Sequence, residues 1–240
     1  MKIFIDDTYE AMSKHVTDDV INIMQPLSQP LFVAASGDSP KGFYKELAER
    51  NNASTIDISN WYFLGLDEWI GLDADDEGSC RYMLNKDLFF PLHLKEEKIC
   101  CFNGKAIDTM QECDRIENFI QQHNGIDVAI VGLGMNGHIG LNEPGTSVTL
   151  RSHVSAIAET TKTVGQKYFS KPQTLTKGIT LGLATLMEAK NLILIVSGEK
   201  KASILKEALQ HEPTEDIPAT LIRNHTNLYV YADKGAANFL

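Results

Sequence analysis

A histidine and a carboxylate stand close together in the stretch 132–144, which reads G-L-G-M-N-G-H-I-G-L-N-E-P. An imidazole such as that of His138 carries protons to and from an oxygen, and a nearby carboxylate such as Glu143 fixes its tautomer. The apolar run I-D-V-A-I-V leads directly into this stretch. We therefore expect a buried strand to deliver both groups onto a tight, glycine-permitted loop. This arrangement is typical of an active site on an α/β sheet and makes an enzyme the first hypothesis.

The same stretch contains three glycines in the bare pattern of a dinucleotide-binding loop, at Gly132, Gly134 and Gly137. That interpretation requires a helix that starts at the third glycine and a ribose-binding acid about 20 residues later. Pro144 and the neighbouring glycines leave no room for a long helix, and no crossover helix separates the pattern from Glu159. The sequence therefore disfavours nicotinamide binding.

Two other loops favour an anion. After the apolar run L-F-V-A-A, small side chains at Ser36, Gly37 and Ser39 let backbone N–H groups approach a negative charge near the start of a helix. After the run L-I-L-I-V, Lys201 stands at a helix start, where a lysine opposes the helix dipole unless an anion lies beside it. An ordinary helix cap and a solvated lysine are the alternatives for these two loops.

Asp67 and Glu68 directly follow the predicted strand 61–66. Carboxylates at such a position are candidates for proton abstraction, because partial burial raises a carboxyl pKa toward neutrality. Helix capping and a solvated pair are the alternatives. The acids of residues 73–78 imitate the start of a calcium loop, but Leu84 stands where that loop requires a bidentate glutamate. We interpret them as a solvated loop and predict no metal site.

Apolar strands alternate with helical stretches along the whole chain of 240 residues. We expect helices over residues 8–24, 41–50, 81–90, 107–123, 162–169, 181–189 and 200–210, and strands over residues 31–35, 61–66, 126–131, 154–158, 191–196 and 228–231. This alternation predicts an α/β fold with a mostly parallel sheet that helices cover on both faces. Because no linker or repeat interrupts it, we expect residues 1–240 to form a single domain. Ligands bind beyond the carboxyl ends of such strands, so the four loops are predicted to share one pocket.

The composition excludes several classes of function. A net charge of −10 argues against nucleic acid, whose binding relies on clustered lysine and arginine. The four cysteines show no C-x-x-C spacing, so we expect neither a disulfide framework nor a metal site, and a reducing cytoplasm fits best. We recognise neither a signal peptide nor an apolar segment long enough to cross a bilayer. Together the residues predict acid–base chemistry on a small phosphorylated substrate, without metal or organic cofactor.

Four segments in this order resemble the glucosamine-6-phosphate deaminase (isomerase) family, which is related to the 6-phosphogluconolactonases. They are Ala35–Pro40, Leu66–Trp69, Gly132–Pro144 and Ser197–Ala202. The G-H-I-G-L-N-E-P stretch is specific for the deaminase side, whereas lactonases carry a different sequence after the Gly-His pair. The D-E-W sequence and G-I-T-L-G-L at residues 178–183 are similar to members described as galactosamine-6-phosphate isomerases. The sugar epimer therefore stays open.

The resemblance implies a modified Rossmann-like fold and a sugar-phosphate site. Asp67 would move a proton from C2 to C1 of the opened sugar. His138 would assist ring opening by proton transfer at the ring oxygen, oriented by Glu143, and the imine would hydrolyse to a ketohexose phosphate and ammonia. Asn136 stands where relatives often have an aspartate, so polarisation of the imidazole would depend on the glutamate.

The resemblance also assigns the phosphate to Ser36, Gly37, Ser39 and Lys201, with Lys167 where many relatives have an arginine. Larger allosteric relatives bind an activator through basic residues shortly after the equivalent of Arg151, and here those positions are His153 and Ser155. We therefore expect no amino-sugar activation and a monomer or small homo-oligomer. A lactone hydrolase on the same fold and a sugar-phosphate-sensing effector domain remain the alternatives.

Overall fold

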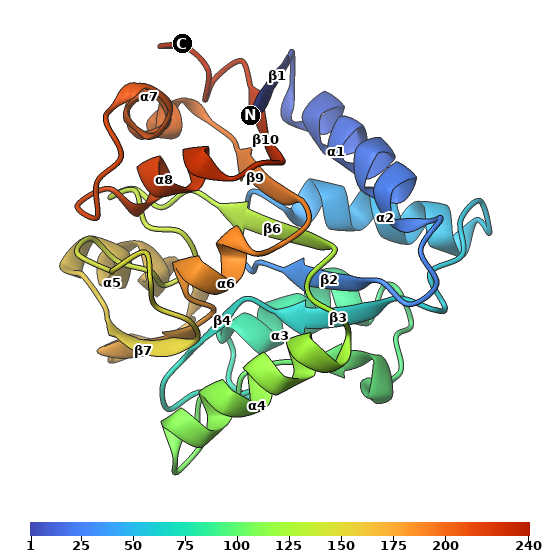
Figure 1. Ribbon diagram of the computed structural model, residues 1–240, viewed down its shortest axis with the longest axis horizontal. Coiled ribbons are helices and arrows are strands. Elements are labelled where there is room, and N and C mark those ends of the chain that lie inside the picture. The colour runs from blue at the N-terminus through green and yellow to red at the C-terminus, as the bar shows by residue number, and fades with distance from the viewer.

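A seven-stranded, wholly parallel sheet forms the centre of the computed structural model, which describes residues 1–240 (Figure 1). Its strands are β1 (Lys2–Asp6), β2 (Leu31–Ala34), β3 (Tyr62–Gly65), β5 (Ile99–Cys100), β6 (Val128–Gly132), β9 (Leu192–Val196) and β10 (Leu228–Asp233). They lie in the order β1-β10-β9-β6-β2-β3-β5. The strand order reverses between β2 and β6, which is where open parallel sheets bind ligands. The predicted α/β fold with a mostly parallel sheet is confirmed.

Helices cover both faces of this sheet because its inner strands are apolar on both sides. One face packs against α1 (Tyr9–Met24) and α2 (Lys41–Asn52), and the other packs against α4 (Thr109–Gln122), α6 (Leu183–Met187), α7 (Ala202–Gln210) and α8 (Pro218–Leu221). Successive side chains of a strand point to opposite faces, so Phe32 of β2 contacts the first group of helices and Val33 the second. Each such fully buried side chain stabilises the fold by about 1.5–3 kcal/mol.

A second, antiparallel sheet stands beside the carboxyl edge of the first and was not predicted. It contains β4 (Asp67–Trp69), β8 (Lys177–Thr180) and β7 (His153–Ala156) in the order β4-β8-β7. Only β7 corresponds to a predicted strand. Asp67 is the first residue of β4 and pairs with Thr180. The aspartate therefore lies where the chain leaves one sheet and enters the other, rather than in a loop.

Several helices differ in detail from the prediction. The stretch predicted as one helix over residues 81–90 is α3 (Cys80–Leu84) followed by a π-helical turn at Asn85–Phe89. Helix α5 (Glu159–Gly165) begins before the predicted residue 162 and ends in a 3₁₀ turn at Gln166–Tyr168. Another 3₁₀ turn, Glu199–Lys201, precedes α7. The short edge strands β1 and β5 were not predicted.

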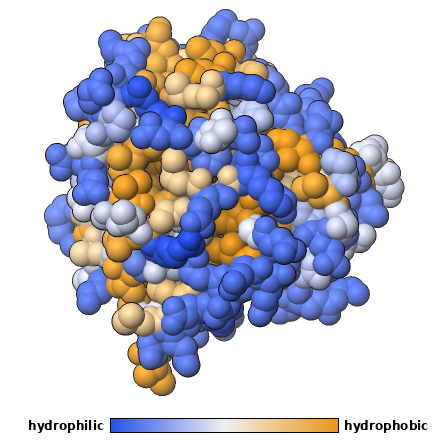
Figure 2. Space-filling view, in the orientation of Figure 1, coloured by the Kyte–Doolittle hydropathy of each residue, from blue (hydrophilic) through white to orange (hydrophobic).

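Much of the face shown in Figure 2 is hydrophilic, with apolar residues in patches between the polar ones. No helix combines the length and the apolar character that a membrane crossing requires. The four cysteines are all free thiols.

Candidate active site

One cavity of about 960 Å³ lies at the carboxyl edge of the central sheet, beside the point where the strand order reverses. The loops after β2, β6 and β9 and the start of β4 all open onto it. The predicted site residues among its lining residues are Ser36, Gly37, Ser39, Asp67, His138, Lys167 and Lys201. The structure thus brings a carboxylate, an imidazole and two ammonium groups from distant parts of the chain to one cavity.

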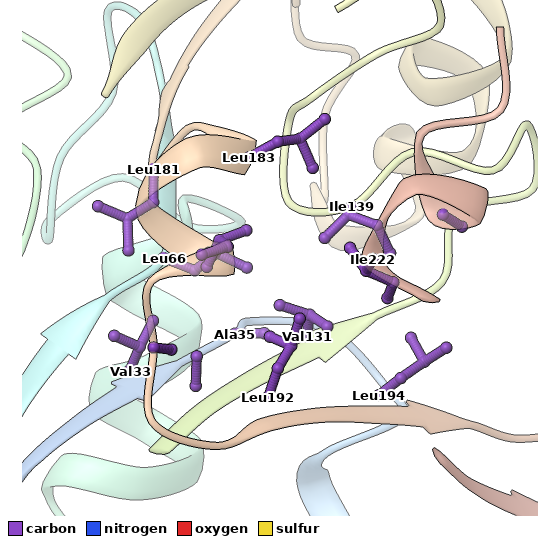
Figure 3. Close-up of a cluster of buried hydrophobic side chains, with 14 of the residues drawn as sticks. Val33, Ala35, Leu66, Val131, Ile139, Leu181, Leu183, Leu192, Leu194 and Ile222 are labelled. Atoms are coloured by element: carbon purple, nitrogen blue, oxygen red, sulfur yellow. The ribbon is translucent and has the colours of Figure 1, made fainter. Parts of the chain in front are cut away.

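The His138 ring lies directly against the backbone of Gly134. A Cβ atom at position 134 would come within 2.4 Å of three atoms of the ring, so no residue with a side chain fits there. The next residue, Ile139, points the other way into the apolar core, where Figure 3 shows it near Val131 and Ile222. Because Ile139 anchors the loop in the core, the neighbouring imidazole is held facing the cavity.

Glu143 and Asn136 do not line the cavity but lie behind the imidazole. Glu143 Oε2 is 3.6 Å from His138 Nδ1, and it accepts a hydrogen bond of 2.8 Å from the Asn136 side-chain amide. Burial alone would raise the pKa of Glu143, but the neighbouring His138, Thr161 and Asn136 side chains hold it below its ordinary value. Glu143 is therefore an ionised acceptor, and Asn136 orients this carboxylate rather than the ring.

Asp67 has the environment that proton abstraction requires. Asp67 is buried, with an exposed fraction of only 9%. Burial raises the pKa of Asp67 to about 6, against the opposing effects of the Cys80 thiol and His138. A carboxyl group that titrates near neutrality can both take a proton from carbon and return it. Asp67 thus combines burial with a pKa that suits acid–base exchange.

Glu68 has a different role from its neighbour, although the sequence presents the two as a pair. Its carboxylate accepts hydrogen bonds of 2.8–2.9 Å from the backbone amides of Trp69, Cys80 and Arg81. Burial raises the pKa of Glu68 to about 7 despite these donors. The side chain lies outside the cavity and caps α3. The helix-capping alternative therefore holds for Glu68 and not for Asp67.

The far end of the cavity carries two lysines beside the loop 36–39. Burial and the charge of Lys167 lower the pKa of Lys201 to about 8, and its ammonium donates a hydrogen bond to the Leu133 carbonyl oxygen. Lys167 forms an ion pair of 2.6 Å with Asp38. Gly37 has a φ of 107°, a conformation that glycine adopts at little cost. An anion bound at this end of the cavity would reduce the repulsion between the ammonium groups of Lys167 and Lys201.

Among the lining residues that the sequence did not predict, Asp38 and Thr161 contact predicted site residues directly. The first faces Lys167, and the second contacts His138 through a hydrogen bond. No local pattern could have found either contact, since each joins residues far apart in the chain.

The structure also describes the two sequence patterns that imitate a calcium loop and a dinucleotide-binding loop. In the first, the acids Asp73 and Asp76 both pair with the Lys105 ammonium, at 2.8 and 2.7 Å. The chain forms no helix at Gly137, and the next helix after β6 is α5. The disfavoured dinucleotide pattern is therefore a loop and not the start of a helix.

The fold and this cavity define an α/β enzyme with acid–base groups beside an anion site. The family model described as glucosamine-6-phosphate isomerases/6-phosphogluconolactonase matches residues 6–230. The chain therefore belongs to this family, as the sequence motifs predicted.

Proteins of the same family are similar over the full length of the chain. A glucosamine-6-phosphate deaminase of Oceanobacillus iheyensis is 36% identical over 98% of this chain and 95% of the relative. A glucosamine-6-phosphate deaminase of Clostridium perfringens is 33% identical over 100% of both chains. The solved structure of a monomeric glucosamine-6-phosphate deaminase superposes with a TM-score of 0.96 at 30% identity, covering 100% of both chains. A 6-phosphogluconolactonase of Thermotoga maritima shares the fold, with a TM-score of 0.77 at 19% identity over 97% of this chain and 99% of the other.

We expect Asp67→Asn to lose at least ~10²-fold in turnover and yet to be more stable at neutral pH. The folded-state pKa of Asp67 lies above its unfolded value, so its stability contribution is present at low pH and lost as the pH rises through about 6. A neutral amide avoids that loss. Urea denaturation should therefore show the variant more stable by about 1–3 kcal/mol at about pH 8, with a smaller gain at about pH 5. Near-wild-type turnover would remove Asp67 from the mechanism.

We expect Gly134→Ala to lower turnover by about 10²-fold, because the added methyl group displaces the His138 ring from its position. Gly132→Ala is the matched control, since a Cβ atom at that position meets nothing within 4 Å. Steady-state kinetics of both variants, with thermal unfolding to verify their folding, provide the measurement. Equal activity in the two variants would contradict the role of the Gly134 contact.

Proposed function

We propose that this protein isomerises and deaminates an amino-hexose 6-phosphate. The reaction is the conversion of glucosamine 6-phosphate to fructose 6-phosphate and ammonia, or of galactosamine 6-phosphate to tagatose 6-phosphate and ammonia. The observation that carries the proposal is the placement of Asp67 and His138 on one cavity with Lys167 and Lys201 at its far end. The deaminase relatives at 33–36% identity over the whole chain support the same substrate class.

Ring opening requires a proton acceptor at the anomeric hydroxyl and a proton donor at the ring oxygen. The neutral imidazole of His138 performs both steps in turn, because Nδ1 is held from behind and Nε2 faces the cavity without a protein partner. Glu143 stabilises the imidazolium that exists between the two steps. Ring opening exposes the carbonyl carbon C1 beside the amine-bearing carbon C2.

Isomerisation moves a proton from C2 to C1. The Asp67 carboxylate takes the C2 proton, the electrons shift onto O1, and a proton from the substrate's own ammonium group converts O1 to the hydroxyl of the enol. The same carboxyl group then returns its proton to C1, while the nitrogen lone pair forms the double bond to C2. The product carries an imine at C2. Water adds to this imine, and ammonia leaves to give the ketohexose phosphate. No metal or organic cofactor takes part in this proposed sequence.

The alternative lactone hydrolase needs attack by water on a carbonyl group and no proton transfer between two carbons. A buried carboxyl group with a pKa of about 6 at Asp67 favours carbon chemistry. The 6-phosphogluconolactonase structures are 17–20% identical to this chain and share its fold, whereas the deaminases of Oceanobacillus iheyensis and Clostridium perfringens are 36% and 33% identical. These observations place deamination ahead of lactone hydrolysis and of a sensing role.

We also infer a monomer without allosteric activation that acts in the cytoplasm. The relative with a TM-score of 0.96 is described as monomeric. Arg151 is engaged by the carboxylates of Glu117 and Glu188 rather than presented to a ligand. Initial rates should therefore follow a hyperbola in substrate concentration, unchanged by N-acetylated amino-sugar phosphates.

Separate incubation with glucosamine 6-phosphate, galactosamine 6-phosphate and 6-phosphogluconolactone tests the proposed reaction. We expect ammonia release from at least one amino-sugar phosphate, and kcat/KM for the two epimers identifies the substrate. A single inverted hydroxyl must be read by specific polar groups, so the preference should be large. Loss of lactone without any release of ammonia would reject the proposal.

Lys201→Met should raise KM at least ~10-fold with a smaller change in kcat, because the cavity loses one of its two phosphate-facing charges. The pKa of Lys201 in the free enzyme is about 8, so the wild-type ammonium is lost as the pH rises above that value. The wild-type KM should therefore rise above about pH 8, and this rise should be absent in the variant. An unchanged KM and the same pH dependence in Lys201→Met would remove this residue from phosphate binding.

A further inference from the structure

The hydroxyl of Thr161 is one of the groups that hold Nδ1 of His138 from behind, and the mechanism above gives it no specific role. Its Oγ1 lies 3.0 Å from His138 Nδ1, which is nearer than the 3.6 Å between Nδ1 and Glu143 Oε2. Thr161 is buried, at 6% exposure, and it also helps to hold the pKa of Glu143 below its ordinary value. Its hydroxyl group is thus nearer to Nδ1 than the carboxylate that lies behind the ring.

The groups around Nδ1 determine which nitrogen of the neutral His138 ring carries the proton. A hydroxyl group donates one hydrogen bond and accepts others, whereas an ionised carboxylate only accepts. Because Glu143 is ionised and its Oε2 lies 3.6 Å from Nδ1 of His138, its negative charge favours a proton on Nδ1. The Thr161 hydroxyl oxygen, 3.0 Å away, then accepts a hydrogen bond from Nδ1, which carries the proton of the neutral ring. Nε2 keeps its lone pair on the cavity side.

We propose that Thr161 is a positioning residue that holds His138 in the Nδ1–H tautomer and so keeps Nε2 free to accept a proton from the substrate. This inference rests on the proposed role of His138 in ring opening. Nε2 takes the proton of the O1 hydroxyl while the C1–O1 double bond forms. The C1–O5 bond breaks, its electron pair leaves on O5, and the imidazolium returns the proton to O5. The opposite tautomer presents an N–H group to O1 and cannot begin this sequence.

The packing of α5 explains how a threonine from a distant part of the chain holds this position. Gly165 at the end of the helix closely approaches Trp69 and Leu175, where a Cβ atom would lie 3.4 and 3.1 Å from their side chains. Trp69 belongs to β4, the strand that begins with Asp67. The helix that carries Thr161 is thus packed on the strand that carries the second acid–base group.

Thr161→Val removes the hydroxyl and nearly preserves the shape of the side chain, whereas Thr161→Ser keeps the hydroxyl. We expect the valine variant to lose about 10–100-fold in kcat with KM within about twofold of the wild type, and the serine variant to regain most of the activity. Thr185→Val is the matched control, because Thr185 is also a buried threonine whose hydroxyl bonds a glutamate, Glu117, away from the cavity. This control should keep the wild-type kcat.

Nitrogen NMR of protein labelled with ¹⁵N-histidine reads the tautomer directly and needs no substrate. At mildly alkaline pH, we expect the wild-type His138 to show a protonated Nδ1. His138→Asn identifies the resonances, and Thr161→Val should shift them toward a mixture of tautomers.

Three results would overturn this inference. They are an Nε2–H tautomer in the wild type, wild-type kcat in Thr161→Val, and a slow Thr161→Val whose tautomer is unchanged. Because the spectrum is recorded without ligand, it tests Thr161 even if the amino-sugar phosphates prove not to be substrates.

Discussion

The withdrawal of ionisable groups from water at one edge of a parallel sheet is the constraint on which this site depends. Burial disfavours the charged form of every group, so it moves the pKa of Asp67 up and that of Lys201 down. Glu143 escapes this trend because its neighbours donate hydrogen bonds to its ionised form. The burial of each group and its hydrogen-bond donors therefore decide together which protonation form it favours.

Such buried groups need rigid support, which the apolar core beneath the loops provides. Ile139 and Leu66, which Figure 3 shows in this core, directly precede or follow residues that face the cavity. The Glu68 side chain ties β4 to the start of α3 by accepting hydrogen bonds from the backbone amides of Cys80 and Arg81. Gly134 lets a ring lie on the backbone itself. Residues that pack in the core thus alternate with residues that face the cavity, so the packing of the core fixes the positions of the cavity side chains.

The sequence predicted those parts of the structure that depend on local pattern. The apolar runs of β2, β6 and β9 are continuous, as buried parallel strands require, and their ends locate the loops of the cavity. Strands β4 and β8 carry acids, a glycine and a lysine in short segments, so no periodic pattern marked them. The contact of Thr161 with His138 depends on how α5 packs, and no sequence spacing encodes it.

The ion pair between Asp38 and Lys167 makes ligand entry an exchange reaction. An anion that binds Lys167 must replace the carboxylate of Asp38 as its partner. The gain in electrostatic attraction therefore depends on the difference in charge between the anion and that carboxylate. Chloride or a simple carboxylic acid replaces one monovalent contact with another and gains little, whereas a doubly charged phosphate ester gains an additional unit of attraction. Under the proposed function, the lysine end of the cavity would thereby discriminate between anions by valence, independently of the hydroxyl groups of the sugar.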